Sequence, residues 1–178
     1  MHTKNKMDVF EKRLVMIREN EQIFKKYYRN EEIGIIICDD RKEDFKKKGS
    51  DLLNAEVKLR FEEVRSIYYR NIINNILYDY SFPEWVVCVE EKVLLEYAIP
   101  ILSRVLKYYP MLCGKDYEWE VLYEISKIDE SFWNIHREWK MFFEDIIRDI
   151  LHSRNERKMD NISEKYICQF ETFIFTEN

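Results

Sequence analysis

Arg148 and His152 are the side chains of this sequence whose types and spacing come nearest to a catalytic pair. They stand four residues apart in RDILH, so one helical turn would place them on the same face. An arginine and a histidine on one helical face can serve RNA cleavage. The simpler interpretation is an i, i+4 pair on the surface of a helix.

The same pair superficially resembles the Arg–His motif of the helical HEPN ribonucleases. That family places four to six residues between arginine and histidine, whereas RDILH has three. The segment RNIINN begins like the motif but has Asn75 where a histidine would be needed. A divergent helical ribonuclease using Arg148 and His152 is therefore the alternative hypothesis.

Other catalytic or ligand-binding patterns are missing from the sequence. His136 and His152 are sixteen residues apart on one predicted helix, about 24 Å at 1.5 Å per residue, so they cannot share a metal. Neither H-E-x-x-H nor Glu-x-x-His occurs, and the four cysteines form no C-x-x-C pair. Three isolated glycines leave no phosphate-binding loop. We therefore predict no catalytic residue, metal or cofactor.

An acidic and aromatic segment is the remaining candidate site. Residues 115–130 hold six acids against two lysines, and Tyr117, Trp119 and Tyr123 lie among them. At the first turn of a helix, the macrodipole favours such acids by ~0.3–1 kcal/mol each. Alternatively, the aromatics offer contact area and the acids attract a basic partner. On that hypothesis the partner-binding residues are Asp116, Tyr117, Glu118, Glu120 and Glu124.

Composition limits the class of protein. The chain has 178 residues, a formal net charge of −5 and a pI of about 5.4. A negative surface disfavours general nucleic-acid binding and favours encounter with basic partners. The N-terminus lacks the apolar stretch of a secretory signal, and no window approaches a transmembrane span. We expect a cytoplasmic protein with reduced cysteines and no membrane contact.

The distribution of glycine and proline favours long helices. Only three of each occur, fewer than the turns of an all-β fold would need. The predicted fold is all-α, one domain spanning 1–178, a bundle of about six or seven helices. The expected helices cover 7–29, 51–78, 81–100, 101–109, 116–127, 132–155 and a last one opened by 160–165. Residues 33–40 are either a short strand or a buried helical turn, and we favour a helix or an irregular buried segment over the strand.

Local signals predict the ends and inner faces of these helices. SFPE is a capping box with Ser81 as N-cap of a helix. Pro100 should end or kink this helix. Ser50 and Ser131 are the predicted N-caps of 51–78 and 132–155. The inward-facing residues expected near the C-terminus include Ile135, Phe142, Phe143 and Cys168.

In size, acidity and helicity the whole chain resembles the immunity proteins that bacteria pair with polymorphic toxins, such as those of contact-dependent growth inhibition. The resemblance implies binding to a cognate basic toxin, often a nuclease, whose active site is blocked by steric and electrostatic occlusion. It implies a binding protein and no enzyme; a helical regulatory adaptor is a further alternative. A second set of acids for the same role is Asp39, Asp40 and Asp44.

Overall fold

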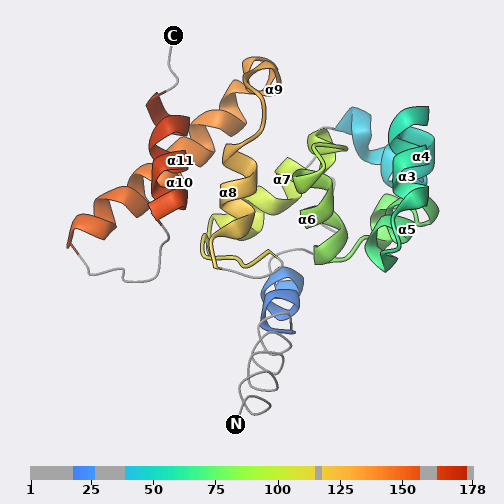
Figure 1. Ribbon diagram of the computed structural model, residues 1–178, viewed down its shortest axis with the longest axis horizontal. Helices are drawn as coiled ribbons and strands as arrows, with labels where there is room; N and C mark the ends of the chain where they lie inside the picture. Colours follow the sequence, from blue (N-terminus) through green and yellow to red (C-terminus); the bar gives the residue numbers. More distant parts are fainter. Residues whose placement is uncertain (1–17, 27–38, 115–117, 157–163, 176–178) are drawn as a thin grey trace.

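The chain folds into an all-α structure, as the sequence predicts. The computed structural model describes residues 18–26, 39–114, 118–156 and 164–175 (Figure 1). Among these residues there is no strand, only an isolated antiparallel bridge between Lys48 and Ile76. Residues 33–38, whose conformation the sequence leaves open, lie outside the described part of the chain.

The helices are shorter and more numerous than predicted. They comprise an unlabelled helix 18–26, η2 (Asp39–Lys46), α3 (Gly49–Leu52), α4 (Ala55–Glu63), α5 (Ile67–Asn74), η3 (Leu77–Asp79), α6 (Phe82–Glu90), α7 (Leu95–Leu106), α8 (Glu120–Ser126), α9 (Glu130–Ile135), α10 (Arg137–Glu156) and α11 (Glu164–Phe175).

Helices α6 and α7 form the centre of the molecule. Helices α3, α4 and α5 lie on one side of this pair, and α8 to α11 lie on the other (Figure 1). Trp85 on α6 and Ile99, Ile101 and Leu102 on α7 are fully buried. The described apolar residues of both sides pack onto this centre as one hydrophobic core.

The predicted helix 51–78 is wrong in its continuity, because two breaks divide it into α3, α4 and α5. The side chain of Asn54 accepts a hydrogen bond from the Val57 amide at 2.9 Å and caps α4. Ser66 occupies the N-cap position of α5. Ser50 lies inside α3 and is not its N-cap. Apolar spacing continues through both breaks, which is why the sequence pattern did not reveal them.

A glycine allows α3 to fold back against α5. The amide of Gly49 donates to the carbonyl of Asn75 at 3.2 Å. A Cβ atom at this position would overlap the Ile72 carbonyl oxygen and the Tyr80 hydroxyl. That hydroxyl itself donates to the Ile72 carbonyl at 2.5 Å, so the close approach is held by a buried hydrogen bond.

The SFPE capping box is confirmed, whereas the prediction that the helix it begins runs on to Pro100 is wrong. Ser81 and Glu84 cap α6 reciprocally, but α6 ends at Glu90, and two residues with positive φ, Lys92 and Leu94, separate it from α7. Pro100 lies inside α7. Proline has no N–H for the carbonyl four residues earlier.

The carbonyl of Glu96, which receives no hydrogen bond from Pro100, has a donor from another element. Nη1 of Arg41, on η2, donates to the Glu96 carbonyl at 3.3 Å and lies 3.0 Å from the Glu96 carboxylate. Ser103 on the next turn donates its hydroxyl to the Pro100 carbonyl at 2.8 Å. The proline is therefore tolerated because neighbouring side chains satisfy backbone groups around it.

The predicted helix 132–155 is also two helices, α9 and α10. Asp129 occupies the N-cap position of α9, with Ser131 inside the helix, and His136 interrupts the helical backbone with φ −115° and ψ 51°. The break turns Ile135 outward, where 79% of it is exposed, so its predicted inward orientation is wrong.

Two further predictions, about which side chains near the C-terminus face the core, need correction. Phe143 is fully buried, whereas Phe142 is only partly buried against the core. Cys168, expected on the apolar side of the last helix, is exposed on α11. The thiols of Cys88, Cys113 and Cys168 form no disulfide among the described residues. No helix in the described segments has both the length and the apolar content that crossing a bilayer requires.

Candidate functional site

The acidic residues around α8 are the first candidate site. Asp116 and Tyr117 lie outside the described residues. Glu118 is exposed, immediately before the helix. Trp119, at the N-cap position, has a left-handed backbone with φ 70°, although its side chain is 2% exposed. Because this conformation is strained for a tryptophan, burial of the indole is what holds the start of α8 in place.

The aromatic residues of this segment belong to the core. Tyr123 is 8% exposed, and its ring stacks on Tyr166 of α11 with centroids 4.5 Å apart. Trp119 is equally enclosed. The described aromatics therefore do not form an exposed contact surface. They join α8 to its neighbours and offer little area to a partner.

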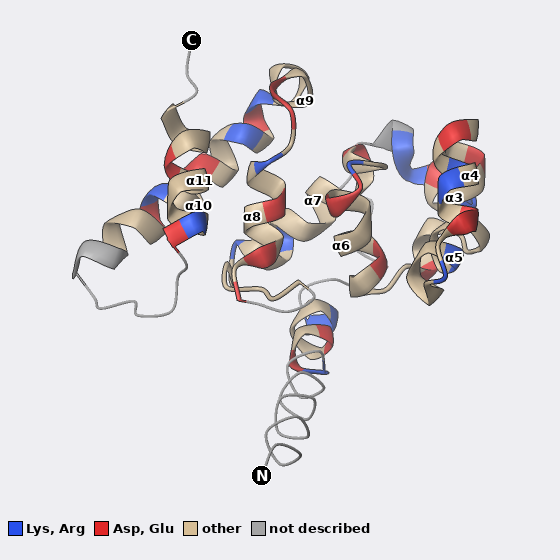
Figure 2. Ribbon diagram, in the orientation of Figure 1, with Lys and Arg blue, Asp and Glu red and all other residues tan. Residues whose placement is uncertain are grey.

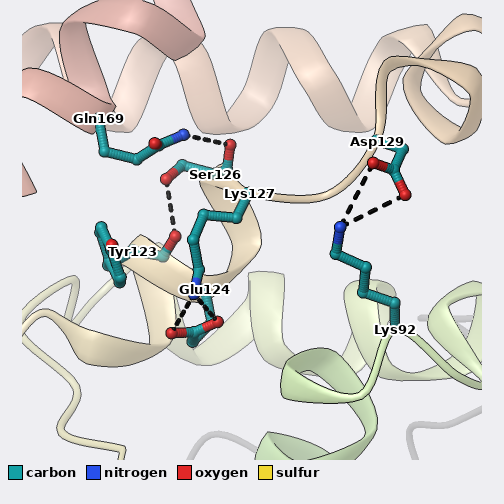
Figure 3. Close-up of polar contacts among 7 residues, drawn as sticks. All are labelled: Lys92, Tyr123, Glu124, Ser126, Lys127, Asp129 and Gln169. Carbon is teal, nitrogen blue, oxygen red and sulfur yellow. Dashed lines mark hydrogen bonds and ion pairs between the residues drawn. The ribbon is translucent and has the colours of Figure 1, made fainter.

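The carboxylates of α8 are partly engaged within the fold. Glu124 pairs with Lys127 at 2.5 Å, and its side chain is 17% exposed (Figure 3). The ammonium groups of Lys127 and Lys165 lie 4.7 and 4.9 Å from the centre of the Tyr123 ring. Glu120 and Glu124 are like charges four residues apart on the helix, and the pairing of Glu124 with Lys127 reduces their repulsion.

The acids of α8 affect the pKa of Tyr166. Burial raises the pKa of its hydroxyl to about 12, and the nearby charges of Glu120, Tyr123 and Glu124 add to the shift. The phenol therefore stays neutral at physiological pH. It serves here as the stacking partner of Tyr123.

Polar contacts fix α8 to the elements around it. The hydroxyl of Ser126 donates to the Tyr123 carbonyl at 2.7 Å, and the amide of Gln169 on α11 donates to the Ser126 carbonyl at 3.0 Å. Asp129 pairs with Lys92, at the strained α6–α7 corner, at 3.3 Å (Figure 3). The Gln169 contact joins α8 to α11, and the Lys92 pair joins the start of α9 to the α6–α7 corner; Glu118, two residues before α8, stays exposed.

The second set of predicted acids lies elsewhere. Asp39 and Asp40 begin η2, and their side chains are outside the described part of the structure. Asp44 accepts hydrogen bonds from Lys47 at 2.7 Å and from the Tyr97 hydroxyl at 2.6 Å. Lys47 and then Tyr97 lower the pKa of its carboxyl. In Figure 1, η2 lies on the far side of α6 and α7 from α8, so the two sets do not form one surface.

Charge is distributed unevenly along the described chain. Residues 118–156 contain ten acids and five bases. All other described residues together contain seventeen acids and sixteen bases. Figure 2 shows acidic positions along α8, α9 and α10. We call residues 118–156 the acidic segment; it carries nearly all the net charge of the described residues.

The outer face of α10 is a part of this segment that the sequence interpretation missed. Met141 is 65% exposed there, with exposed carboxylates on Glu138, Asp145 and Asp149. None of these three acids is among the ion pairs of the described residues. Their spacing of three, four and eight residues from Met141 is visible in the sequence, but only the orientation of α10 shows that this face points to solvent.

The Arg148–His152 pair also lies on the exposed side of α10. The guanidinium of Arg148 is 3.7 Å from the carboxylate of Glu144, which is itself buried. Glu144 is thus flanked by Arg148 one turn later and by Lys140, 4.0 Å away, one turn earlier. In this structure Arg148 compensates a buried acid, in agreement with the interpretation as a surface pair.

Metal binding has no support in the described geometry. No group of three histidine, cysteine, aspartate or glutamate side chains is placed to hold an ion within residues 18–26, 39–114, 118–156 and 164–175. His136 lies at the break before α10, with Nε2 3.9 Å from the Glu96 carboxylate. It therefore lies between α9 and α7, apart from His152.

Comparison with known proteins gives no relative for this chain. No family model, no curated protein and no solved structure matches it. Any function therefore has to be argued from the surface described above.

Proposed function

We propose that this protein is an immunity-type inhibitor that binds a cognate basic toxin, most simply a nuclease domain, and covers its active surface. The observation that carries the proposal is the charge segregation: ten acids against five bases in the acidic segment, and near balance in all other described residues. A surface of this kind attracts a basic protein over distance and repels phosphate backbones.

The proposed mechanism is occlusion. A nuclease binds its substrate through lysine, arginine and histidine side chains that contact phosphates. Exposed carboxylates such as those of Glu118, Glu138 and Asp145 would occupy the same cations in place of phosphate. The toxin would then be excluded from its substrate by the body of the inhibitor as well as by the competing charge.

Rigidity of the acidic segment supports this role. Helix α8 is joined to α11 by Gln169, and the inner face of α10 is buried at Phe143 and Ile147. A surface that is already ordered loses little conformational entropy on association, which favours tight binding. Glu120 and Glu124, both within α8, contribute mainly to the field of the segment, because Glu124 is already paired with Lys127.

A binding measurement tests the proposal. The purified product of the gene immediately upstream should bind the full chain, and the dissociation constant should rise steeply between 50 and ~500 mM salt, since exposed charges are screened within ~10 Å at 0.1 M. The complex should also suppress whatever nuclease activity the product has. Absence of binding at micromolar concentrations would contradict the proposal.

An activity assay separates this proposal from the ribonuclease alternative. The isolated chain should not cleave RNA. Cleavage that is retained through purification and lost in His152→Ala would replace the inhibitor proposal with an enzyme using Arg148 and His152.

A further inference from the structure

We propose that the partner docks on the outer face of α10 and the adjoining end of α9, a surface that we call the Met141 face: Ile135, Glu138, Met141, Asp145 and Asp149. The inference rests on the function proposed above and names the surface that performs it. The partner element that fits is a basic protein surface with an apolar depression bordered by lysine or arginine.

Two apolar side chains of this face are displayed to solvent. Ile135 is 79% exposed and Met141 is 65% exposed. They come from the last turn of α9 and the first turns of α10, on either side of the break at His136. Burying such side chains in a partner contributes favourable apolar area, and methionine adapts to varied contact shapes.

Carboxylates border Met141 along one edge of the helix. Glu138 is three residues before it, Asp145 four residues after it and Asp149 eight residues after it, so all three follow the same side of α10. All three are exposed, and within the described part of the chain they take part in no ion pair. Two bases lie on this side of α10: Arg148, 3.7 Å from the Glu144 carboxylate, and Arg137, exposed one turn before Met141.

The helix that presents this face is firmly fixed. On its inner side Phe143 and Ile147 are fully buried and Ile150 is 5% exposed. Trp133 of α9 contacts the Phe143 ring with centroids 6.0 Å apart. The backbone that carries the Met141 face is therefore held in place before any partner binds, which suits an interface better than a segment that must fold on binding.

Helix α4 provides a natural comparison, because it repeats the same pattern. Leu59 is 62% exposed, with Glu56 three residues before it and Glu63 four residues after it. Its surroundings differ: residues 55–74 contain three acids and four bases, whereas residues 129–149 contain six acids and three bases. Charge steering of a basic partner therefore favours the Met141 face over the α4 face.

Matched triple variants test this choice. Glu138→Lys, Met141→Ser and Asp145→Lys alter α10, and Glu56→Lys, Leu59→Ser and Glu63→Lys make the corresponding change on α4. Both variants have the same net charge and the same loss of apolar area. Circular dichroism and thermal unfolding show whether each full-length variant retains the fold. The probe is the purified product of the gene immediately upstream, titrated at two salt concentrations.

The α10 variant is expected to weaken binding at least ~100-fold and the α4 variant less than ~3-fold, because reversed charges and a lost apolar contact act only at an interface. Equal affinities for the wild type and the α10 variant would overturn this inference while leaving the proposed function in place. A wild-type chain that does not bind would overturn both.

A measurement on the unaltered chain covers the case in which the α10 variant does not fold. In the complex with the same probe, amide hydrogen exchange should slow in residues 135–149 and remain unchanged in residues 55–63. The reverse pattern would place the interface on α4 and overturn the inference.

Discussion

The two ends of the molecule, on either side of the central α6–α7 pair, differ in how far their contacts use carboxylates. The end formed by η2, α4 and α5 combines ring contacts, such as those of Phe45 with Trp85 and Tyr97, with hydrogen bonds to carboxylates. Tyr69 donates to Glu91 at 2.5 Å, and Arg60 lies 3.1 Å from the same carboxylate. On the adjacent turn of α5, Asn71 donates to the buried carboxylate of Glu84 at 2.8 Å.

The end formed by α9, α10 and α11 is assembled mainly from aromatic rings. Trp133 contacts Phe143 and Phe173 with centroids 6.0 and 5.7 Å apart. Phe170 is fully buried beside them in the same core. One ion pair also joins α10 to α9, between Lys140 and Glu130 at 2.8 Å, but Glu138 and Asp145 take part in none among the described residues.

This difference explains which acids remain for a partner. Where helices are joined through acids, as at Glu84 and Glu91, those carboxylates already have hydrogen-bond partners within the protein. Where they are joined by rings, the acids of the outer face stay exposed, as with Glu138 and Asp145. The acidic surface at this end therefore consists of carboxylates that the contacts between helices do not use.

The largest effect is expected in the aromatic end. Phe143→Ala should lower the free energy of unfolding by ~3–5 kcal/mol, because a fully buried ring is removed from between Trp133 and the core. Phe142→Ala, one residue away and only partly buried, should cost clearly less. Urea denaturation measures both, and equal losses would show that α10 is rotated relative to the orientation described.

An intermediate effect is expected in the polar end. Asn71→Ala should lower the free energy of unfolding by ~1.5–3 kcal/mol, since it removes a donor from the buried Glu84 carboxylate. Asn74→Ala is the control: this exposed residue bonds only the carbonyl of Arg70 on its own helix, at 2.9 Å. Both changes alter helix propensity alike, so a difference below ~0.5 kcal/mol between them would contradict the role assigned to Asn71.

The smallest effect concerns pH and Asp44. Lys47 and Tyr97 lower the pKa of this carboxyl in the folded protein below its ordinary value of 3.8. The folded state then binds the proton more weakly than the unfolded state. The resulting stability is fully present above about pH 3.8 and is lost as pH falls through the lowered folded-state pKa.

Asp44→Asn should therefore destabilise the protein at pH 7, with a deficit that narrows at and below pH 3. The deficit of Phe143→Ala, which involves no titratable group, should not narrow through the same window. Denaturant titrations at several pH values measure both. A constant deficit for Asp44→Asn would mean that its bonds to Lys47 and Tyr97 contribute nothing to the fold.

Helix content and one helix start could be predicted from local signals. The scarcity of glycine and proline and the apolar spacing predicted an all-α chain, and SFPE located the start of α6 correctly. Helix continuity could not be predicted in this way. Asn54 and His136 interrupt helices whose apolar period runs on through the break, because the segments on both sides pack against the same core.

Part of the candidate site could also be predicted. The excess of acid from residue 118 onward is a property of the sequence, but the aromatic residues that first drew attention to it, Trp119 and Tyr123, are buried. Met141 and its neighbouring acids gave no comparable signal, because Leu59 has the same spacing. That both side chains face solvent becomes apparent only when the helices are placed in space.

By itself the sequence determined the helical class, the capping of α6 and the acidity of residues 118–156, because these depend on residue type and on neighbours within one or two turns. Only the tertiary structure decided which carboxylates are used within the fold and which face solvent. The reason is physical: the partners of Glu84, Glu91 and Asp129 come from distant parts of the chain, brought close by burial of the common core.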